Sequence, residues 1–324
     1  MEEREANLKQ EAAHPHGRAR VPSATAGDSL SRAARTQPRT YLQQSWARFR
    51  RNWLAIAALI LVVIALLFGY GAPLISEYVT HRDYAEQVLL DRFKQPGEDG
   101  YILGTDNIGR DLLTRLAYGT RVSLTVALLA VASALTIGCS LGAVAGYYGR
   151  WVDSVIMRFV DVMLAFPSLI LLIFISTLVS VSPNRLALVI ASVSWMGLSR
   201  LVRGEFLALR QRDYVEAARV VGVPDHRIIA RHMLPNVLPI IIVWATLAVP
   251  SFILSEAALS FLGFGVQPPV PSLGNMLQGA ITYIDQTWLL LLVPGLSIYV
   301  IVLALSLFGN GLRDALDPRL GEQQ

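Results

Sequence analysis

The side chains best suited to chemistry are few in this chain and form no catalytic pattern. Its 324 residues include five histidines, one cysteine and two lysines. An ATP-binding loop needs a lysine followed by Ser or Thr, whereas Gln follows both Lys9 and Lys94. The sequence also lacks the HExxH spacing of zinc hydrolases. Its G-x-S-x-G match, GCSLG at 138–142, lies inside a long apolar run and not at the strand-to-helix turn that a nucleophilic serine requires. We therefore expect no catalytic, cofactor-binding or metal-binding residues, and any ATP energy has to come from another chain.

The composition indicates a membrane protein instead. Hydrophobic residues make up 53% of the chain and charged residues only 16%, whereas charged residues are about 25% of an average soluble domain. The single cysteine, Cys139, lies in an apolar run, so we expect a packed hydrophobic side chain rather than a reactive thiol.

Long stretches without charged residues predict an all-α fold with six membrane-spanning helices. A spanning helix needs about 20 apolar residues, and the apolar stretches place the spans near 53–75, 122–148, 158–181, 186–205, 236–256 and 288–309. The uncharged part of the fourth, Leu186 to Ser199, is short, and it can span if Arg200 extends its charged end to the interface. The segment GFGVQPPVPSLGN breaks the apolar stretch that follows Glu256 with glycines and prolines. A lipid-exposed backbone of this kind could not satisfy its hydrogen bonds, so we expect an irregular connection on the outer face.

The arginines and lysines predict the orientation. Ten basic residues precede the first span and seven lie between Arg200 and His232, whereas none lies between Leu262 and Trp288. Because basic residues favour cytoplasmic loops, we expect both termini in the cytoplasm. The segment 77–121, with six basic and eight acidic residues, then lies outside. Arginines beside membrane spans are orientation signals, so nucleic acid is not an expected partner.

These features divide the chain into five parts. A tail poor in aromatic residues is expected to be disordered. Asp106 is expected to cap an amphipathic helix that lies on the outer leaflet and leads into the second span. The glycines Gly138, Gly142 and Gly146 predict close helix packing. The parts are a disordered cytoplasmic tail at 1–44, an interfacial elbow with the first span at 45–76, an exported loop with the amphipathic helix at 77–121, a five-helix core at 122–310, and a C-terminal cytoplasmic tail at 311–324.

One charged cytoplasmic stretch, DYVEAARVVGVPDHRIIARHMLPNVLP, from Asp213 to Pro239, is more specific. Asp213 followed three residues later by Glu216 is a capping-box pattern, so a helix should begin at Tyr214. Gly222 suits the left-handed position that ends a helix. The first half of the stretch therefore predicts one short, well-defined helix.

A second helix should follow this glycine. Pro224 is favoured in the first turn of a helix, and Asp225 complements the positive end of its dipole. This helix should run to about Met233, and Leu234 and Pro235 should begin the next span. We refer to residues 213–233 as the bracket: two short, stiff helices in the cytoplasm.

The bracket resembles a known motif, in which EAA is followed by three residues, Gly, and later by Leu-Pro. This is the motif of permease subunits of bacterial ABC importers, and the chain departs from it at His232, where an apolar residue is usual. The form RHMLPN resembles the dipeptide, oligopeptide and nickel branch. The matching residues are Glu216, Ala217, Ala218, Gly222, Leu234 and Pro235.

Other segments resemble the C-type permease subunit of this branch. They are LGTDNIGRDLLTRLAYGTRVSL, GYYGRWVDSVIMRFVDVMLAFPSLIL, RLVRGEFLALRQRDYVEAAR and EAALSFLGFGVQPPVPSLGNML, and the resemblance covers nearly everything from about Ser45 to Arg319. It implies a type I ABC importer permease fold in the bacterial plasma membrane. It also implies a second permease subunit, two cytoplasmic ATPase subunits that bind ATP and Mg²⁺, and an extracytoplasmic solute-binding protein.

The resemblance further implies that a cytoplasmic segment, 206–235, couples the permease to an ATPase subunit. Its cargo would be di- or oligopeptides, with nickel, glutathione or another small solute as alternatives. The residues expected to carry the coupling are Asp213, Glu216, Ala217, Ala218, Gly222, Pro224, Leu234 and Pro235.

An ion-coupled secondary transporter is the alternative from another class, because such carriers use buried carboxylates. Glu256, near the outer end of its span, is either a candidate gate residue or the partner of another helix-end group. Asp153, Arg158 and Asp161 cluster at the cytoplasmic end of the third span, and Arg158 and Asp161 are spaced to pair along a helix.

Overall fold

The computed structural model describes residues 41–179 and 182–316. The predicted disorder of 1–40 and the last residues of the predicted C-terminal tail lie outside this range. The chain divides into two units, Met1–Gln44 and Ser45–Gln324. Of the first unit only the backbone of residues 41–44 is described. These four residues begin the helix Tyr41–Arg51, whereas the prediction assigned them to the disordered tail. The other described residues all belong to the second unit.

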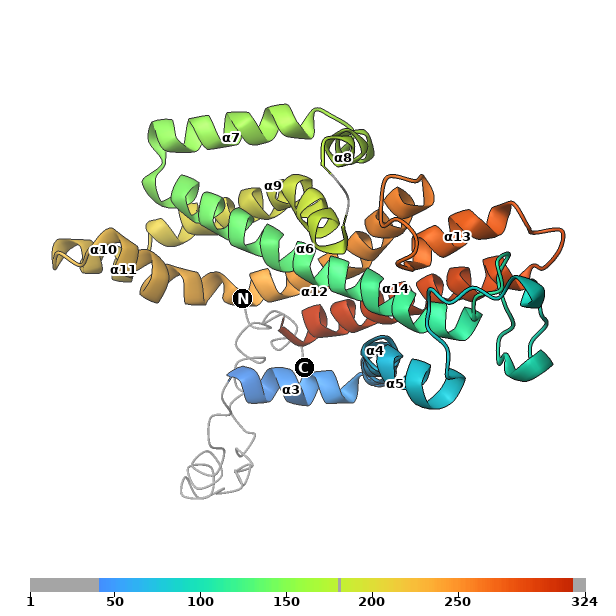
Figure 1. Ribbon diagram of the computed structural model, residues 1–324. Coiled ribbons are helices and arrows are strands. Elements are labelled where there is room, and N and C mark those ends of the chain that lie inside the picture. The colour runs from blue at the N-terminus through green and yellow to red at the C-terminus, as the bar shows by residue number, and fades with distance from the viewer. Residues whose placement is uncertain (1–40, 180–181, 317–324) are drawn as a thin grey trace, which may run out of the picture. The chain divides into compact units, whose positions relative to one another are not determined.

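The described chain is helical, which confirms the all-α prediction, and the described residues form no strand beyond an isolated bridge between Thr105 and Asp111. The helices in chain order (Figure 1) are α3 (Tyr41–Arg51), α4 (Trp53–Tyr70), α5 (Ala72–Leu74), the π-helical η2 (Ile75–Thr80), the short 3-10 helices η3 (Leu89–Asp91) and η4 (Glu98–Gly100), α6 (Leu112–Tyr148), α7 (Arg150–Leu164), α8 (Ser168–Thr177), α9 (Pro183–Arg210), α10 (Asp213–Val220), α11 (Asp225–Arg227), the π-helical η5 (Ile228–Met233), α12 (Leu234–Phe261), α13 (Leu273–Ile281) and α14 (Leu289–Leu316).

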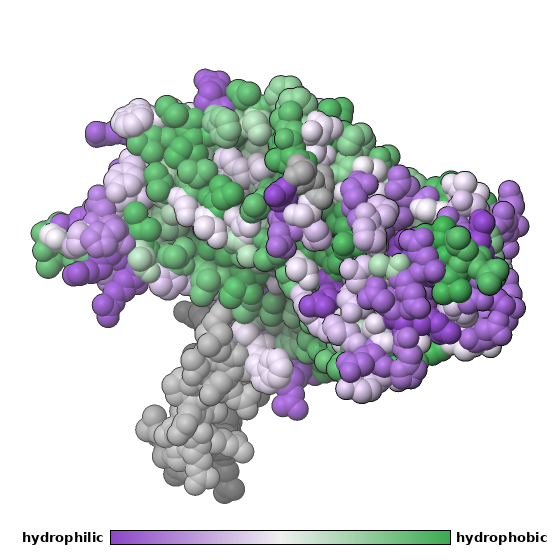
Figure 2. All heavy atoms as spheres, viewed as in Figure 1, coloured by the Kyte–Doolittle hydropathy of each residue, from purple (hydrophilic) through white to green (hydrophobic). Residues whose placement is uncertain are grey.

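Five helical segments within the described ranges are long and apolar enough to cross a membrane: Trp53–Tyr70, Leu112–Tyr148, Pro183–Arg210, Asp225–Phe261 and Leu289–Leu316. The bent pair α7 and α8 makes a sixth if it is counted as one span. The count agrees with the six predicted spans. Large apolar side chains remain exposed on these segments, as expected for helices that face lipid, and Figure 2 shows the apolar surface that they form.

The third span differs from the single helix expected at 158–181. The helices α7 and α8 meet at 91° across a short break that contains Pro167. Proline has no backbone N–H and disfavours helical geometry in the residue before it, here Phe166, so the helix cannot continue straight through this point.

The helices α6 and α9 pack along a row of glycines. A Cβ atom added at Gly138 would lie 2.9 Å from the carbonyl oxygen of Trp195, and one at Gly142 would lie 2.5 Å from that of Ser199. One added at Gly146 would meet the carbonyl oxygen of Arg203 at 2.8 Å. Any side chain at these positions would push the two backbones apart, so the close packing predicted from the glycine spacing is confirmed (Figure 1).

The start of α6 corrects a second prediction. The helix begins at Leu112, and Asp111 caps it by accepting a hydrogen bond of 2.7 Å from the backbone N–H of Thr114. Asp106 lies in the preceding loop and accepts hydrogen bonds from the backbone N–H groups of Ile108 and Arg110, each at 3.0 Å. The segment leads into the second span, as expected, as the first turns of α6. Its apolar residues Leu112 and Leu116 are buried in the protein, whereas a helix on the outer leaflet would expose them to lipid.

The connection after α12 is less irregular than expected. After a loop at 262–272, the nine residues of α13 form a helix with a full capping box between Ser272 and Asn275. The side chain of Ser272 accepts from the N–H of Asn275 at 3.2 Å, and the side chain of Asn275 accepts from the N–H of Ser272 at 3.0 Å. The prolines and glycines before Ser272 conceal this helix in the sequence.

Candidate functional site

The first helix of the bracket is α10, and it begins one residue earlier than predicted. Arg212 occupies the N-cap position with an extended backbone, and the N-cap makes no side-chain hydrogen bond. The predicted capping box is therefore wrong. Asp213 and Glu216 both lie in the first turn of the helix and are exposed. In this position their carboxylates complement the positive end of the helix dipole.

The turn between the two bracket helices is the one that Gly222 predicts. The φ angle of Gly222 is +82°, in the left-handed region. The N–H of Val223 donates to the carbonyl oxygen of Ala218 at 3.0 Å, and the N–H of Gly222 donates to that of Arg219 at 2.9 Å. This pair of bonds is the Schellman motif, which satisfies the last carbonyls of a helix and fixes the direction of the chain beyond it.

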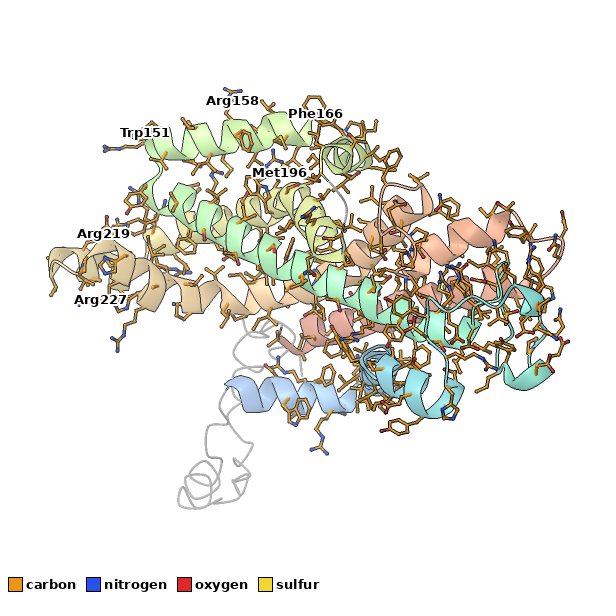
Figure 3. All side chains as sticks on the ribbon, in the orientation of Figure 1. Trp151, Arg158, Phe166, Met196, Arg219 and Arg227 are labelled. Carbon is orange, nitrogen blue, oxygen red and sulfur yellow. The ribbon has the colours of Figure 1, made fainter. Side chains whose placement is uncertain are left out.

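The tip of the bracket is apolar and exposed. Val220 is 87% exposed and Val221 is 81% exposed, immediately before the turn. Arg219 and Arg227 extend from the same part of the bracket (Figure 3). Two large apolar side chains left in water, next to cationic groups, are typical of a surface that binds another protein.

The base of the bracket is packed into the protein. Val215, Ile228 and Met233 are completely buried, and they belong to one apolar cluster with Phe206 of α9 and Tyr147 of α6. Each buried side chain of this size contributes roughly 1.5–3 kcal/mol. The bracket therefore cannot move independently of the ends of α6 and α9 against which it packs.

A polar contact also links α6 to the bracket. The hydroxyl of Tyr147 donates a hydrogen bond of 2.6 Å to Oδ1 of Asp225, and the guanidinium carbon of Arg219 lies 4.9 Å from the centre of the Tyr147 ring. Tyr147 is not among the residues that the sequence predicts to carry coupling. Its partner is 78 residues away in the chain, and no local pattern connects the two residues.

The second half of the bracket continues directly into a membrane span. Pro224 is at the N-cap, one position before the first turn where it was predicted, and Asp225 is in the first turn of α11 as expected. The π-helical η5 follows, and α12 begins with Leu234 and has Pro235 in its first turn, as expected. From Asp225 to Phe261 the chain is one continuous helical segment, which joins the second half of the bracket to α12.

The candidate gate residue, Glu256, lies fully buried at a different site. One carboxylate oxygen accepts a hydrogen bond of 2.5 Å from the hydroxyl of Ser123, and the other accepts one of 2.7 Å from the hydroxyl of Ser260. Those hydroxyls in turn accept from the backbone N–H groups of Leu273 at 3.3 Å and Val266 at 3.1 Å. Within the described ranges no basic side chain forms an ion pair with Glu256, so it joins α6, α12 and the start of α13 through hydroxyl groups.

The charged residues of α7 pair differently from the prediction. Asp161 forms an ion pair with Arg200 of α9. Asp153 forms one with Arg203, whose Nε and Nη2 each donate to one carboxylate oxygen, Nη2 at 2.6 Å. Figure 3 shows Arg158 on the side of α7 that faces away from α9. The predicted pair of Arg158 and Asp161 is therefore wrong, because α9 presents two arginines to the acidic side of α7.

Comparisons with known proteins agree with this architecture. The family model described as binding-protein-dependent transport system inner membrane component matches residues 138–322. A second model, the N-terminal TM domain of oligopeptide transport permease C, matches residues 40–96. These two models together cover most of the described helices.

Individual relatives match over nearly the whole chain. A dipeptide transport system permease of Alkalihalophilus pseudofirmus is 42% identical over 86% of this chain and 90% of its own length. One from Haemophilus influenzae is 39% identical over 87% of this chain and 96% of its own. A glutathione transport system permease of Pectobacterium atrosepticum is 37% identical, with 87% and 92% covered.

These relatives are transport subunits and not enzymes, which confirms the expectation that this chain is a transport component. Several apolar helices and the family description together place it in the inner membrane as a multi-pass protein. The resemblance to permease subunits of dipeptide and oligopeptide importers is confirmed as well. The chain belongs to the family of binding-protein-dependent transport system inner membrane components.

Proposed function

We propose that this chain is one of two permease subunits of an ATP-driven importer of di- or oligopeptides, with both termini in the cytoplasm. The cargo assignment is supported by relatives named as dipeptide, di/tripeptide and oligopeptide permeases, which are 36–42% identical to it. Glutathione is the second candidate, because one relative at 37% identity carries that name.

The full transporter would contain a second permease subunit, two cytoplasmic ATPase subunits that bind ATP and Mg²⁺, and an extracytoplasmic solute-binding protein. The pore would lie between the two permeases. This arrangement is supported by the family description, which names dependence on a binding protein. It is also supported by the sequence, in which Gln follows both lysines, so the chain cannot form a phosphate-binding loop of its own.

The bracket is the observation that carries the coupling mechanism. Its apolar tip, Val220 and Val221, would dock in a cleft of one ATPase subunit. The small Ala217 and Ala218 would allow that surface to approach closely. Closure of the ATPase pair would push the tip, and the buried cluster at the base would transmit the displacement to α6, α9 and α12.

The remaining coupling residues would keep the bracket stiff. Asp213 and Glu216 stabilise the start of α10, and Gly222 and Pro224 set the angle between the two helices. Leu234 and Pro235 join the second helix to α12. A flexible loop of the same length would absorb the push instead of transmitting it.

Glu256 would act at the opposite end of the same machinery, as a gate residue. Its network joins α6 and α12, both of which reach the bracket, to the start of α13. A displacement of α12 relative to α6 would therefore separate Glu256 from Ser123 and release the start of α13.

A cysteine crosslink tests this function. In a variant with Cys139→Ser, Val221→Cys should crosslink to an ATPase subunit in the assembled transporter, with a yield that changes when ATP is bound. Glu98→Cys, in the exported loop, is the matched control and should never capture that subunit. Uptake into proteoliposomes should require ATP and should persist when the proton gradient is collapsed. Uptake that follows the gradient without ATP would establish an ion-coupled carrier instead.

A further inference from the structure

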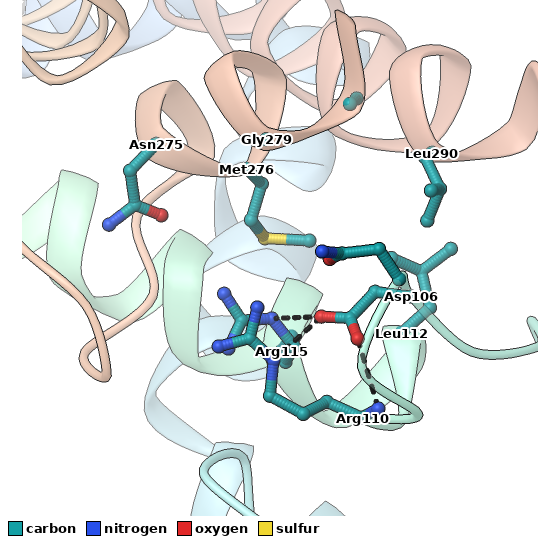
Figure 4. A pocket seen from close by; sticks show the side chains of 10 residues that line it. Asp106, Arg110, Leu112, Arg115, Asn275, Met276, Gly279 and Leu290 are labelled. Carbon is teal, nitrogen blue, oxygen red and sulfur yellow. Dashed lines mark hydrogen bonds and ion pairs between the residues drawn. The ribbon is translucent and has the colours of Figure 1, made fainter. Parts of the chain in front are cut away.

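A small pocket lies away from the bracket, where the loop before α6, the start of α6 and the helices α13 and α14 meet (Figure 4). Its volume is about 40 Å³. We call it the arginine pocket and define it by Asp106, Asn107, Arg110, Arg115, Asn275 and Met276. Nothing in the proposed coupling mechanism uses these residues.

The charges in the arginine pocket do not balance. Nε of Arg110 lies 2.7 Å from Oδ2 of Asp106, and Nε of Arg115 lies 3.5 Å from the same oxygen (Figure 4). The side chains are only 12%, 6% and 9% exposed for Arg110, Arg115 and Asp106. Two nearly buried guanidinium groups therefore share one carboxylate, and a buried charge without a partner is costly.

The neighbouring acid does not supply the missing charge. Oδ2 of Asp111 accepts both the N–H and the hydroxyl of Thr114, at 2.7 and 2.6 Å, so this carboxylate caps α6. No ion pair joins Asp111 to either arginine within the described residues. The arginine pocket keeps a net positive charge at the beginning of a 37-residue helix, whose dipole adds further positive potential.

Several hydrogen-bond donors in the pocket remain available. A guanidinium carries five N–H donors in a planar fork. Among the described residues, the terminal nitrogens of Arg110 have no protein acceptor, and Arg115 uses one of its own to hold the carbonyl oxygen of Tyr84 at 3.2 Å. The amide of Asn107 lines the same pocket. Donors in a fork, arranged around a small volume, are suited to a carboxylate group.

From this geometry we infer that the arginine pocket receives the carboxylate of an aspartate or glutamate side chain of the solute-binding protein. The inference rests on the proposed function. The pocket is small, about 40 Å³, which suits a single side-chain carboxylate. The chain segment that leads into the pocket also carries Glu98 and Asp99, which are 47% and 60% exposed, so the surface there is polar. A polar surface of this kind is typical of a transient partner that arrives through water, whereas a permanent membrane partner would cover apolar surface.

The test titrates the solute-binding protein against the assembled transporter in proteoliposomes and measures ATP-driven uptake. Arg110→Gln removes one guanidinium at the edge of the pocket and keeps a polar side chain. The half-saturating concentration of the binding protein should rise about tenfold, and its dependence on salt should weaken. Lys94→Gln is the matched control, because it removes one positive charge from the same loop outside the pocket. It should change the half-saturating concentration by less than about twofold.

A charge exchange identifies the occupant. Arg110→Glu should weaken docking further, and replacing a single acidic residue on the binding protein with arginine should restore it. The inference is overturned if Arg110→Gln and Asn107→Ala assemble normally and behave like Lys94→Gln. It is also overturned if the effect of Arg110→Gln disappears with peptides whose C-terminal carboxylate is amidated, since the cargo would then be the occupant, or if only an acid of the second permease restores docking. In each of these cases wild-type uptake still requires ATP and the binding protein, so the proposed function stands.

Discussion

The hydroxyl of Tyr147, at the end of α6, donates a hydrogen bond of 2.6 Å to the carboxylate of Asp225, at the start of α11. This bond joins a membrane helix to the second half of the bracket, and the ring of the same tyrosine holds Arg219 from the first half. One side chain therefore fixes both bracket helices relative to α6. If the bracket transmits a push, the transmission depends on this tyrosine as well as on the packed cluster beneath it.

Tyr147→Phe tests this dependence. The variant keeps the ring, its packing and its contact with Arg219, but loses the bond to Asp225, which we expect to cost about 1–2 kcal/mol because the acceptor is charged. Amide hydrogen exchange in residues 213–233 should become faster, and more ATP should be hydrolysed per peptide imported. Tyr148→Phe is the control, because Tyr148 is 46% exposed and packs only edge-on against Tyr147. If the two variants behave alike, the bond does not contribute to coupling.

Gly222→Val tests the turn of the bracket. A Cβ atom at this position would meet nothing within 4 Å, so the cost comes from the backbone angle of +82° and not from a clash. A left-handed β-branched residue should cost at least about 1–2 kcal/mol. The bracket should then open at its tip, and ATP hydrolysis should continue while uptake falls.

The control for this position is Gly222→Asn, because asparagine tolerates left-handed geometry. It should retain most of the coupling, measured as peptides imported per ATP. If Gly222→Val transports normally, the bracket angle is not required. If Gly222→Asn fails as completely as Gly222→Val, the position is limited by a partner surface and not by the backbone.

The features that the sequence predicts well are those set by local physics. The length of an apolar stretch is enough to predict a span. The turn at Gly222 needs only a residue that accepts a positive φ. The glycine row on α6 can be predicted because residues spaced four apart share one face of a helix. Pro167 also marks the break in the third span locally. Hydropathy does not show this break, because the residues on both sides of it are apolar.

The features that the sequence does not predict are contacts between distant segments. Glu256 stands out as a carboxylate in an apolar stretch, but its bond to Ser123 joins residues 133 positions apart. The same holds for Asp161, which pairs with α9 instead of its neighbour Arg158. The capping box at Asp213 failed for a smaller reason, since Arg212 takes the cap and moves the start of the helix by one residue.

Gly142→Ala tests the close contact between α6 and α9. The added methyl group would lie 2.5 Å from the carbonyl oxygen of Ser199 and 2.9 Å from Cβ of Val202, so one helix would have to move. Overpacking of this kind costs about 1–3 kcal/mol. The purified transporter should unfold at a lower temperature. Gly204→Ala, on α9, meets nothing within 4 Å and should be neutral or slightly stabilising. Equal melting temperatures for the two variants would mean that the helices are not in contact along this row.

Glu256→Ala tests whether the buried carboxylate organises the loop after α12 and the start of α13. Its removal takes the acceptor from the hydroxyls of Ser123 and Ser260, which hold the N–H groups of Leu273 and Val266. Because those hydroxyls are no longer fixed, we expect the exchange of these two amides to become about tenfold faster. This corresponds to a loss of about 1.4 kcal/mol in the free energy of opening the two hydrogen bonds.

For a gate residue, faster exchange at Leu273 and Val266 should accompany reduced ATP-driven uptake, with the bracket unchanged in its own exchange. Glu256→Gln should lie between the wild type and Glu256→Ala, since the amide keeps one acceptor oxygen. Ser255→Ala is the control, because that hydroxyl donates only to the carbonyl oxygen of Ser251 in the same helix. Faster exchange in Glu256→Ala with uptake unchanged would leave Glu256 as a packing residue of α12. Unchanged exchange would show that the hydroxyl network does not hold the start of α13.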